Sequence, residues 1–452
     1  MLDRQEIREK IFNQIQSALS DNQHQKAINI FLDLHPGDQV EVFDMLDSKD
    51  KAEILSRLDI LATAQLFNLQ EDQETLEAAE ALPIERLADV LDEMAPDEAA
   101  DLLLDLPPDQ AAEALDQMED IEDILPLLEY PDETAGGRMT TEFLSIRKTA
   151  TAAEVIEQLR NAKPESEVPY YIFVIDQNKK LVGVTGLREL VVSSPQTDIE
   201  SIMDVEVISV DAWLDQEAVA RVMVQYDLSA LPVVDEGKQL VGVVTHDDIL
   251  DVLQEEATED IYRLASVSDF ELEPDSPIRE QLKGRLPWLF LNTLTALFAS
   301  WVISNFEAII AQVAVLAVFQ SVVAGQGGNA ASQSVAMFVR AIALGKVPRG
   351  QTLSLLLRQM MVGLLQGVAV GIVVGVGVTL WKGNPYLGAV LGLALIGNLI
   401  LAGIVGTLTP LGLKAIGQDP AMASSVLVTA ATDSLGFFIF LSLARIFFAD
   451  LI

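Results

Sequence analysis

The sequence contains no cysteine and only three histidines, and no histidine follows His246. The absence of cysteine excludes disulfide bonds and thiolate metal sites. Zinc, copper and nickel prefer imidazole or thiolate ligands, so the C-terminal part of the chain is poorly suited to them. Any metal ligands there must be oxygen atoms, which suit hard cations such as magnesium and calcium.

Positive charge is also scarce, with 29 lysines and arginines against 68 acidic residues and a net charge of −39. Only four of the acids lie after Arg285, namely Glu307, Asp419, Asp433 and Asp450. The chain therefore joins an acidic hydrophilic part to an apolar, slightly basic part. The acidic field concentrates cations and repels nucleic acid, so we expect no nucleic-acid partner.

Four apolar runs in the C-terminal part are each long enough to cross a lipid bilayer, which takes roughly 20 residues. They cover residues 286–304, 360–380, 386–408 and 421–443. A fifth run begins at Ala308 and continues into "AGQGGNAASQS". A continuous helix over 308–344 would measure about 55 Å, so we expect a break or bend at these glycines. The sequence thus predicts a five-helix transmembrane domain.

Loop charge predicts the orientation of these spans. With the N-terminus inside, most basic residues flank the cytoplasmic ends: Arg279, Lys283, Arg285, Arg340, Lys346, Arg349, Arg358 and Lys414. This agrees with the positive-inside rule. The first residues, "MLDRQEIREKIFNQIQ", contain no apolar signal-peptide core. We therefore expect the soluble domains in the cytoplasm and the C-terminus outside.

Asp433 is the only charged residue in the last span, within "VTAATDSLGFFIF". A carboxylate facing lipid is costly, so Asp433 must face protein or water. Either it lines an ion path, or it is a structural residue that is hydrogen-bonded to Asn398 or Thr432. Magnesium keeps several waters and is usually held by one or two carboxylates. One such carboxylate per chain, and two in a homodimer, would suit a wide magnesium path.

The N-terminal part shows helix-start signals every 12 or 13 residues between residues 26 and 130. Examples are "HPGDQVEVFDML", "LPIERLADVLDEM", "APDEAADLLLDL" and "PPDQAAEALDQM". Proline in the first turn followed by an acid favours a helix N-terminus. Short helices at this spacing predict an all-α superhelix. Asp97 and Asp101 are four residues apart and would share one helix face.

A pattern then repeats at an interval of 59 residues. Val174-Ile175-Asp176 and the following "LVGV" recur as Val233-Val234-Asp235 and a second "LVGV". Each copy reads as strand, turn, strand and helix start, and the two together resemble a tandem CBS-domain pair of α+β fold over 137–253. The resemblance implies an adenosine-nucleotide site, such as one for ATP, at Thr245 and Asp248 of "GVVTHDD". The first copy reads "GVTGLRE" and lacks this pair, so we expect at most one nucleotide site per chain.

No P-loop and no nucleophile–base pair accompanies this motif, so we predict that the protein is not an enzyme. The next segment, "THDDILDVLQEEATEDIYRLASV", is a helix rich in acids that leads to the first span. Like charges four residues apart on a helix repel unless cations or water offset them. This predicts a cation-responsive gate that splays without divalent cations and closes when they bridge the acids.

The whole chain resembles MgtE-type magnesium transporters. The resemblance is carried by "YPDETAGGRMTTEF", the CBS pair, "EEATEDIYRLASV", "GGNAASQS", "GQDPA" and "TDSLGF". It implies a homodimeric, magnesium-selective, channel-like protein of the bacterial plasma (inner) membrane, with a pore along the dimer axis. It also implies a helix from about Glu255 to Lys283 that plugs the pore when cytoplasmic magnesium is high.

The resemblance assigns roles to individual residues. Asp433 is the pore metal ligand, and the pore-lining candidates are Asn329, Gly328 and Asn398. The regulatory magnesium ligands that it implies are Asp97, Asp101, Asp215, Glu217, Asp227, Asp248, Asp251, Glu256, Glu259 and Asp260.

These observations divide the chain into five predicted parts. They are an N-terminal superhelix (1–132), two CBS domains (133–200 and 201–253), an acidic connecting helix (254–284) and a transmembrane pore domain (285–452). Two other functions stay open. One is an ion-coupled cation carrier in which Asp433 relays protons or cations, and the other is a nucleotide-sensing membrane regulator.

Overall fold

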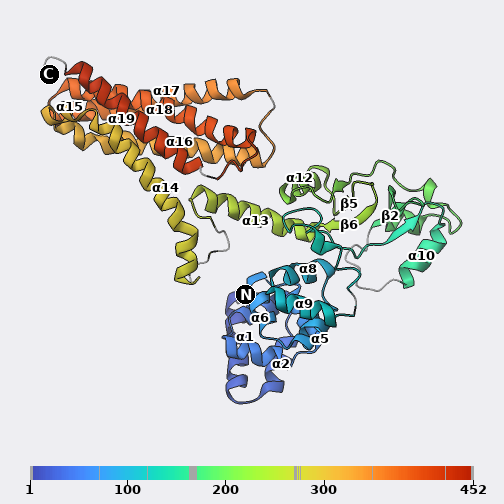
Figure 1. Ribbon diagram of the computed structural model, residues 1–452. Coiled ribbons are helices and arrows are strands. Elements are labelled where there is room, and N and C mark those ends of the chain that lie inside the picture. Colours follow the sequence, from blue (N-terminus) through green and yellow to red (C-terminus); the bar gives the residue numbers. More distant parts are fainter. Residues whose placement is uncertain are drawn as a thin grey trace. The chain divides into compact units, whose positions relative to one another are not determined.

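The computed structural model describes residues 4–70, 72–119, 121–161, 171–268, 272, 274, 276–348, 350–422 and 424–448. It forms two compact units, Met1–Val252 and Leu253–Ile452 (Figure 1). We call them the soluble unit and the membrane unit and describe each by itself. Arg349, one of the predicted flanking bases, lies outside the described residues.

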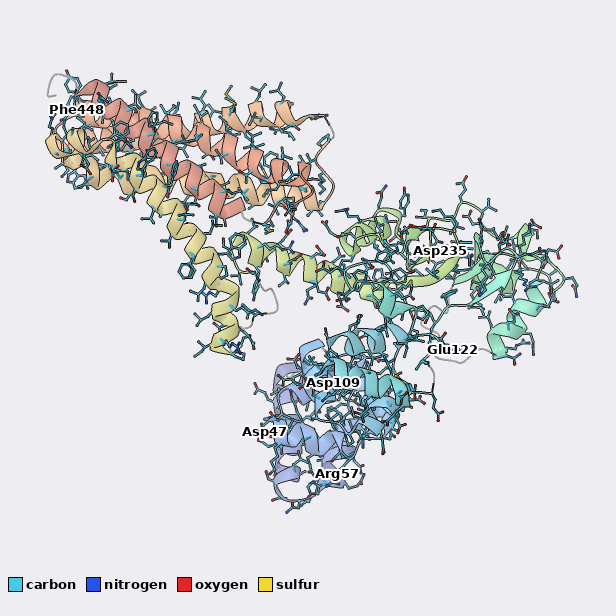
Figure 2. All side chains as sticks on the ribbon, in the orientation of Figure 1. Asp47, Arg57, Asp109, Glu122, Asp235 and Phe448 are labelled. Carbon is cyan, nitrogen blue, oxygen red and sulfur yellow. The ribbon has the colours of Figure 1, made fainter. Side chains whose placement is uncertain are left out.

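The N-terminal part of the soluble unit consists of short helices, as predicted. They are α1 (Arg4–Ser20), α2 (His24–Leu32), α3 (Pro36–Asp44), α4 (Ser48–Leu55), α5 (Ile60–Phe67), α6 (Asp72–Glu80), α7 (Ile84–Leu91), α8 (Pro96–Asp105) and α9 (Pro108–Gln117). Acidic residues mark several N-termini: Asp47 caps α4, and Asp109 lies in the first turn of α9 (Figure 2). Contacts join alternate helices, such as α3 with α5 and α5 with α7, so the helices stack. Phe31, Phe43 and Phe67 are fully buried in the resulting core.

The second part of the soluble unit contains the two predicted repeats. The first comprises β1 (Ser145–Arg147), α10 (Ala152–Asn161), β2 (Tyr171–Ile175), β3 (Leu181–Gly186) and α11 (Leu187–Val192). The second comprises β4 (Val210–Asp211), α12 (Gln216–Tyr226), β5 (Ala230–Val234), β6 (Leu240–Thr245) and the start of α13 (His246–Leu264). The short 3₁₀ helices η1 (Leu127–Glu129) and η2 (Ile199–Ser201) precede the repeats. In both sheets the first strand is parallel to the second, and the second is antiparallel to the third.

The segment that leads into each repeat packs on the sheet of the other repeat. Met139, before the first repeat, lies against Gly242 of β6, where an added Cβ would be 2.3 Å from the Met139 sulfur. Met203, before the second repeat, lies in the same way against Gly183 of β3, at 2.6 Å. The glycine of each "LVGV" is therefore required by the methionine of the opposite copy, which ties the two repeats together.

The membrane unit is a helical bundle. Its helices are α14 (Ile278–Ser304), α15 (Glu307–Gln312), α16 (Val315–Ala343), α17 (Thr352–Lys382), α18 (Pro385–Ala415) and α19 (Ser424–Phe447). Within the described residues, α14, α17, α18 and residues Ser425–Phe447 of α19 are long and apolar enough to cross a membrane. Four of the five predicted spans are thus confirmed by length and composition. The fifth stays a prediction, although α16 packs against α18 and α19.

Two details of the prediction were wrong. The helix was expected to break or bend at the glycines of "AGQGGNAASQS"; it does not break there, because α16 continues through them from Val315 to Ala343. The interruption falls earlier, between α15 and α16 at Val313 and Ala314. The acidic connecting segment 254–284 was expected to be one helix, yet α13 ends at Leu264 and α14 begins at Ile278. Pro277 is the N-cap residue of α14, and because a proline disfavours helical conformation in the residue before it, it explains where α14 begins.

Glycines bring α17 and α18 close together. Gly363, Gly367, Gly371 and Gly375 recur every four residues along α17 and are buried. A Cβ on Gly363 would lie 2.3 Å from the carbonyl oxygen of Leu399, and one on Gly371 would lie 2.7 Å from that of Gly392. Small residues at this spacing allow close backbone contact in membrane proteins, where apolar burial between helices gives little driving force.

Candidate functional site

Asp433 lies in the middle of α19 and is partly buried. The two partners expected for a structural aspartate make other hydrogen bonds. The Thr432 hydroxyl donates to the carbonyl of Val428 at 2.9 Å, and the Asn398 amide nitrogen donates to the carbonyl of Val323 at 2.8 Å. No hydrogen bond or ion pair to the Asp433 carboxylate occurs among the residues that the structure describes. The carboxylate is therefore not committed to a neighbour within the bundle.

Asn398 of α18 is fully buried inside the bundle. Its side chain occupies the space that two glycines leave on the facing helices. A Cβ on Gly327 of α16 would lie 2.2 Å from the Asn398 nitrogen, and one on Gly436 of α19 would lie 2.7 Å from its oxygen. Asn398 thus joins three helices within one chain, and this position gives it a packing role.

Asn329 of α16 is exposed, together with Gln326 and Gln333. These three amides are spaced three and four residues apart, so they lie on one side of the helix. The opposite side carries Val323, Gly327 and Ala331, which are buried against the rest of the bundle. Gly328 lies next to the exposed side, and no atom lies within 4 Å of an added Cβ there. Because amide groups are costly in lipid, this polar stripe needs water or another protein surface.

The end of α13 is attached to the start of α19 inside the membrane unit. The guanidinium of Arg263 makes ion pairs with both Glu259 on its own helix and Asp419 before α19. The hydroxyls of Ser266 and Ser425 are hydrogen-bonded at 2.8 Å. Leu264 packs on the buried cluster of α16, α18 and α19. The helix that carries Asp433 is therefore in direct contact with the acidic segment.

A second attachment joins the same segment to α14. The backbone N–H of Ser268 donates to the carbonyl of Gly284 at 3.1 Å. The indole N–H of Trp288 donates to the Ser268 hydroxyl at 2.7 Å. Sequence reasoning missed Arg263 and Asp419, because 156 residues separate them. The motif "GQDPA" marked the position of Asp419 without indicating its partner.

Several predicted regulatory residues lie on the second repeat. Asp215 caps α12 by accepting hydrogen bonds from the backbone N–H groups of Glu217 and Ala218, at 3.1 and 3.3 Å. Glu217 pairs with Arg221 at 2.8 Å. Asp227 ends α12 in the left-handed conformation with φ of 54°. The carboxylates of Asp215 and Asp227 are solvent-exposed and therefore accessible to ions.

Asp248 lies in the first turn of α13 beside Thr245, the last residue of β6. The buried Thr245 hydroxyl lies 2.5 Å from an Asp248 carboxylate oxygen and 2.6 Å from one of Asp247. Burial raises the pKa of Asp248, and the hydrogen bond from Thr245 partly opposes this shift. Burial and the charge of Asp247 also raise the pKa of Asp251, whereas Arg138 lowers it. The predicted nucleotide residues Thr245 and Asp248 are thus adjacent.

The remaining predicted ligands lie elsewhere on the helices. Asp97 and Asp101 lie on α8, as predicted, with Asp97 buried and Asp101 lining a small pocket with Glu98 and Asp105. Glu256 and Asp260 are partly buried on α13. No group of three or more histidine, cysteine, aspartate or glutamate side chains that could hold a metal occurs in the described part of the chain. The regulatory ligand set therefore stays a prediction.

Comparison with protein families defines the class. Residues 320–443 match the model of the MgtE family, described as a divalent cation transporter. Residues 34–133 match the MgtE intracellular N domain, and 135–194 and 199–255 each match a CBS domain. The protein is thus a membrane transporter of divalent cations with CBS domains.

Individual relatives define the family more narrowly. The magnesium transporter MgtE of Enterococcus faecalis is 39% identical over 99% of both chains. The magnesium transporter MgtE of Thermus thermophilus is 40% identical over 71% of both chains. The chain belongs to the MgtE family of magnesium transporters.

Solved structures resemble the soluble unit. A crystal structure of the soluble part of a magnesium transporter is 37% identical and covers 55% of this chain and 99% of that one, with a TM-score of 0.51. The cytosolic domain of the Mg²⁺ channel MgtE in complex with ATP is 35% identical and covers 53% of this chain and 98% of that one, also with a TM-score of 0.51. These matches agree with the predicted helical domain and CBS pair.

Proposed function

We propose that the protein is a homodimeric, magnesium-selective channel whose pore lies between two copies of α16 and α19. The observation that carries this proposal is the position of Asp433. It is the only charged residue between Ala421 and Leu443, is partly buried, and has no ion pair or hydrogen bond among the described residues. The exposed amides of Gln326, Asn329 and Gln333 lie on α16, which packs against α19. A water-filled path between two protomers would remove both the carboxylate and the amides from lipid.

The ligand chemistry favours magnesium. The membrane helices contain no histidine or cysteine, so hard oxygen donors dominate. Two Asp433 carboxylates facing each other across a two-fold axis would hold a hydrated ion without stripping its waters, which magnesium releases reluctantly. Asn329, with the backbone near Gly328, would line the path. Asn398 would support it from within the bundle, by holding α16 and α19 at a fixed spacing.

Gating would come from cytoplasmic magnesium acting on the acidic residues of α8, α12 and α13. Repulsion between these acids opposes closure, and divalent cations shared between them offset it. The Arg263 contacts with Glu259 and Asp419 would pass the movement of α13 to α19 and so to Asp433. In this arrangement the soluble unit lies in the cytoplasm of a bacterial cell and the C-terminus outside, as loop charge indicates.

The second CBS copy would also hold one adenosine nucleotide per chain. The partly buried Asp248 carboxylate lies beside a buried threonine hydroxyl, and a carboxylate in such a position suits the hydroxyls of a ribose. The similar cytosolic domain solved in complex with ATP supports this assignment. Calorimetric titration of ATP into the purified chain and its Asp248→Ala variant tests it, and equal affinities would contradict it.

A coupled carrier is the second candidate, because a partly buried carboxylate without a partner can also relay protons. Magnesium uptake into liposomes that carry the purified protein tests both candidates. Removing the carboxylate that partners a cation in a confined site costs roughly 2–5 kcal/mol. Asp433→Ala and Asp433→Asn should therefore lower magnesium flux about 30-fold or more. Glu307→Ala, which removes an exposed acid at the start of α15, should not change it.

Native flux in a folded, dimeric Asp433→Ala variant would contradict the pore assignment. Uptake that stops when the proton and sodium gradients are collapsed would favour the carrier. Uptake that continues and follows the membrane voltage would favour the channel.

A further inference from the structure

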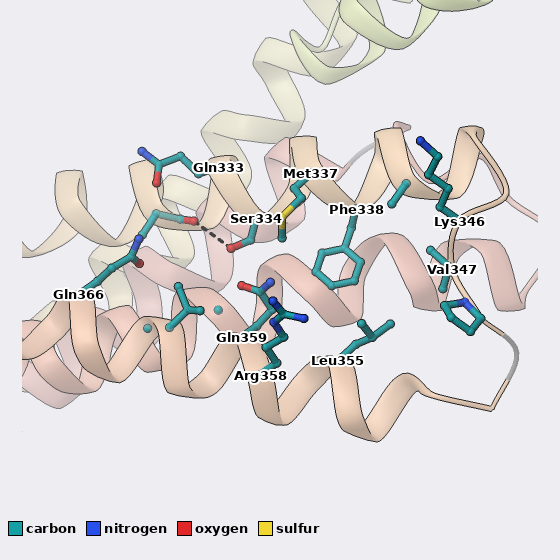
Figure 3. A pocket seen from close by; sticks show the side chains of 16 residues that line it. Gln333, Ser334, Met337, Phe338, Lys346, Val347, Leu355, Arg358, Gln359 and Gln366 are labelled. Atoms are coloured by element: carbon teal, nitrogen blue, oxygen red, sulfur yellow. Dashed lines mark hydrogen bonds between the residues drawn. The ribbon is translucent and has the colours of Figure 1, made fainter.

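The membrane unit contains a cavity beside the proposed pore, and Gln333 of α16 is common to both. It has a volume of about 550 Å³ and lies between α16, α17 and the segment that connects them. Figure 3 shows Phe338 of α16 on one side and Arg358 and Gln359 of α17 on the other, with Lys346 at one end. This volume is within the range of about 300–1,000 Å³ that is typical of small-ligand sites.

The walls of this cavity combine two kinds of chemistry. Phe338, Leu355 and Val362 supply apolar surface, whereas Lys346 and Arg358 supply positive charge. The hydroxyl of Ser334, which also lines the cavity, already donates to the carbonyl of Ala330 at 3.1 Å. A ligand of this site therefore needs both an apolar part and a group that accepts hydrogen bonds from cations.

The charge of the two basic residues is not balanced locally. The sequence contains no acidic residue between Glu307 and Asp419, a stretch that includes all of α16, α17 and α18. Lys346 and Arg358 are both exposed and make no ion pair with any described residue. An anionic group would therefore find two cations free to bind it, and a lysine and an arginine are the usual partners of phosphate.

We propose that this cavity binds an anionic phospholipid of the surrounding bilayer. Lys346 and Arg358 would hold the headgroup phosphate, and one acyl chain would lie along Phe338, Leu355 and Val362. Basic pockets between membrane helices commonly hold anionic headgroups. A membrane lipid is the occupant because the cavity lies beside two apolar helices, where a water-soluble phosphate compound would leave most of the wall uncovered.

The position of the cavity gives the lipid a structural role. The same helix, α16, carries Asn329 and Gln333, and Gln333 also lines the cavity. A bound lipid would support α16 through Phe338 and Gln333, which line the cavity. The proposal of lipid binding does not depend on the proposed pore. The experiment therefore measures lipid binding and not magnesium flux.

The experiment measures lipid binding by native mass spectrometry on the delipidated, full-length protein. Dioleoyl phosphatidylglycerol is titrated into the native chain, into a Lys346→Gln/Arg358→Gln variant and into an Arg340→Gln/Lys414→Gln control. The control removes two exposed bases of α16 and α18 that do not line the cavity. A basic residue near anionic lipid contributes about a fivefold gain in affinity, so the cavity variant, which lacks two of them, should bind roughly 25-fold more weakly.

The control variant should bind like the native chain, and dioleoyl phosphatidylcholine should bind much more weakly than the anionic lipid. Equal binding by the cavity variant and the native chain would overturn the proposal, as would equal binding of the two lipids. Glycerol 1-phosphate provides a third arm. If it binds as tightly as the lipid, the site recognises a free phosphate compound and the lipid assignment is wrong. Circular dichroism and size-exclusion chromatography check that the variants are folded.

Discussion

The two units of this protein are held together in different ways. In the soluble unit, large side chains such as Phe31, Phe43 and Phe67 fill a core, and their burial removes apolar surface from water. In the membrane unit, the contact between α17 and α18 is made by glycines that let the backbones touch. Many large side chains there are exposed instead, including Phe290, Leu380 and Trp381.

The difference follows from the solvent that each unit meets. Water drives apolar side chains inward, so the soluble unit gains stability in proportion to the apolar area that it buries. Lipid chains solvate leucine and phenylalanine as well as a protein core does, so the membrane unit depends on close contact and a few polar bonds. Large apolar side chains therefore pack the core of the soluble unit, whereas small residues make the contacts between helices of the membrane unit.

The largest expected effect tests the soluble side of this comparison. Phe43→Ala should destabilise the soluble unit by about 3–5 kcal/mol, because it leaves a cavity in a closed core. Leu32→Ala, at a position that is 45% exposed, should cost less than about 1 kcal/mol. Urea unfolding of the full-length protein, followed by circular dichroism, measures both. Similar losses for the two variants would show that the core is not well ordered.

The next effect tests the membrane side with one substitution at two positions of α17. Gly363→Ala should destabilise the membrane unit by about 1–3 kcal/mol, because the new methyl group meets the Leu399 carbonyl. Gly377→Ala has open space around it and should stabilise the helix by up to about 1 kcal/mol. Thermal unfolding in detergent gives both values, and the opposite signs are the result to look for. Equal effects would mean that glycine contacts do not hold this unit.

The third prediction concerns the link between the units. Replacing Asp248, Asp251, Glu256 and Glu259 by alanine should keep the pore open at high internal magnesium, with flux there at least about tenfold above the native level. A tenfold change corresponds to about 1.4 kcal/mol of gating free energy. The reason is that magnesium would lose the carboxylates through which it favours closure. Liposome flux as a function of internal magnesium measures this.

A matched control removes the same charge from exposed acids that have no assigned role: Asp21, Asp33, Glu80 and Glu113. This variant should still close at high internal magnesium. If the two fourfold variants behave alike, net charge and not specific binding controls the gate.

The smallest expected effect is the change in stability with pH when either of two aspartates of the soluble unit is replaced. The pKa of Asp248 is raised by burial, so its ionised form destabilises the fold above that pKa and the penalty disappears as pH falls through it. Asp248→Asn should therefore stabilise the soluble unit at pH 7 and lose this advantage as the pH falls through the raised pKa of Asp248. Melting temperatures across this pH range measure the change.

Asp176 provides the opposite case. Hydrogen bonds from the backbone N–H groups of Lys180 and Asn178 lower its pKa, so its ionised form stabilises the fold at neutral pH and this contribution fades as pH falls through the lowered pKa. Asp176→Asn should lower the melting temperature at pH 7. If both variants shift it in the same direction, burial does not govern the titration of Asp248.

Local patterns in the sequence predicted most of the soluble unit. Proline followed by an acid marked the starts of α3, α8 and α9, and the 59-residue repeat predicted the paired strands β2 and β3 and their copies β5 and β6. The prediction of one helix over residues 254–284 was wrong, because a high content of acidic residues does not mark where a helix ends, whereas Pro277 marks where α14 begins. The predicted break in α16 was also wrong. In a membrane bundle, glycine can permit close helix contact without ending a helix.

In the candidate site, too, some residues could be predicted from local sequence and others could not. Asp433 could be found from the sequence alone, because a single carboxylate within an apolar run is evident from the neighbouring residues in the chain. The Arg263 contact with Asp419 could not be found, since nothing local marks a pairing across 156 residues. The packing position of Asn398 against Gly327 and Gly436 likewise depends on three helices meeting at one level.

By itself the sequence determined the segregation of charge, the spans, the repeats and the lone intramembrane acid, because each is a property of neighbouring residues. Only the tertiary structure decided which helices touch, which glycines are indispensable, and that Lys346 and Arg358 face one apolar cavity. Periodicity and charge act over a few residues along the chain. Contacts between helices depend on where the chain turns back, and small differences in backbone distance decide them.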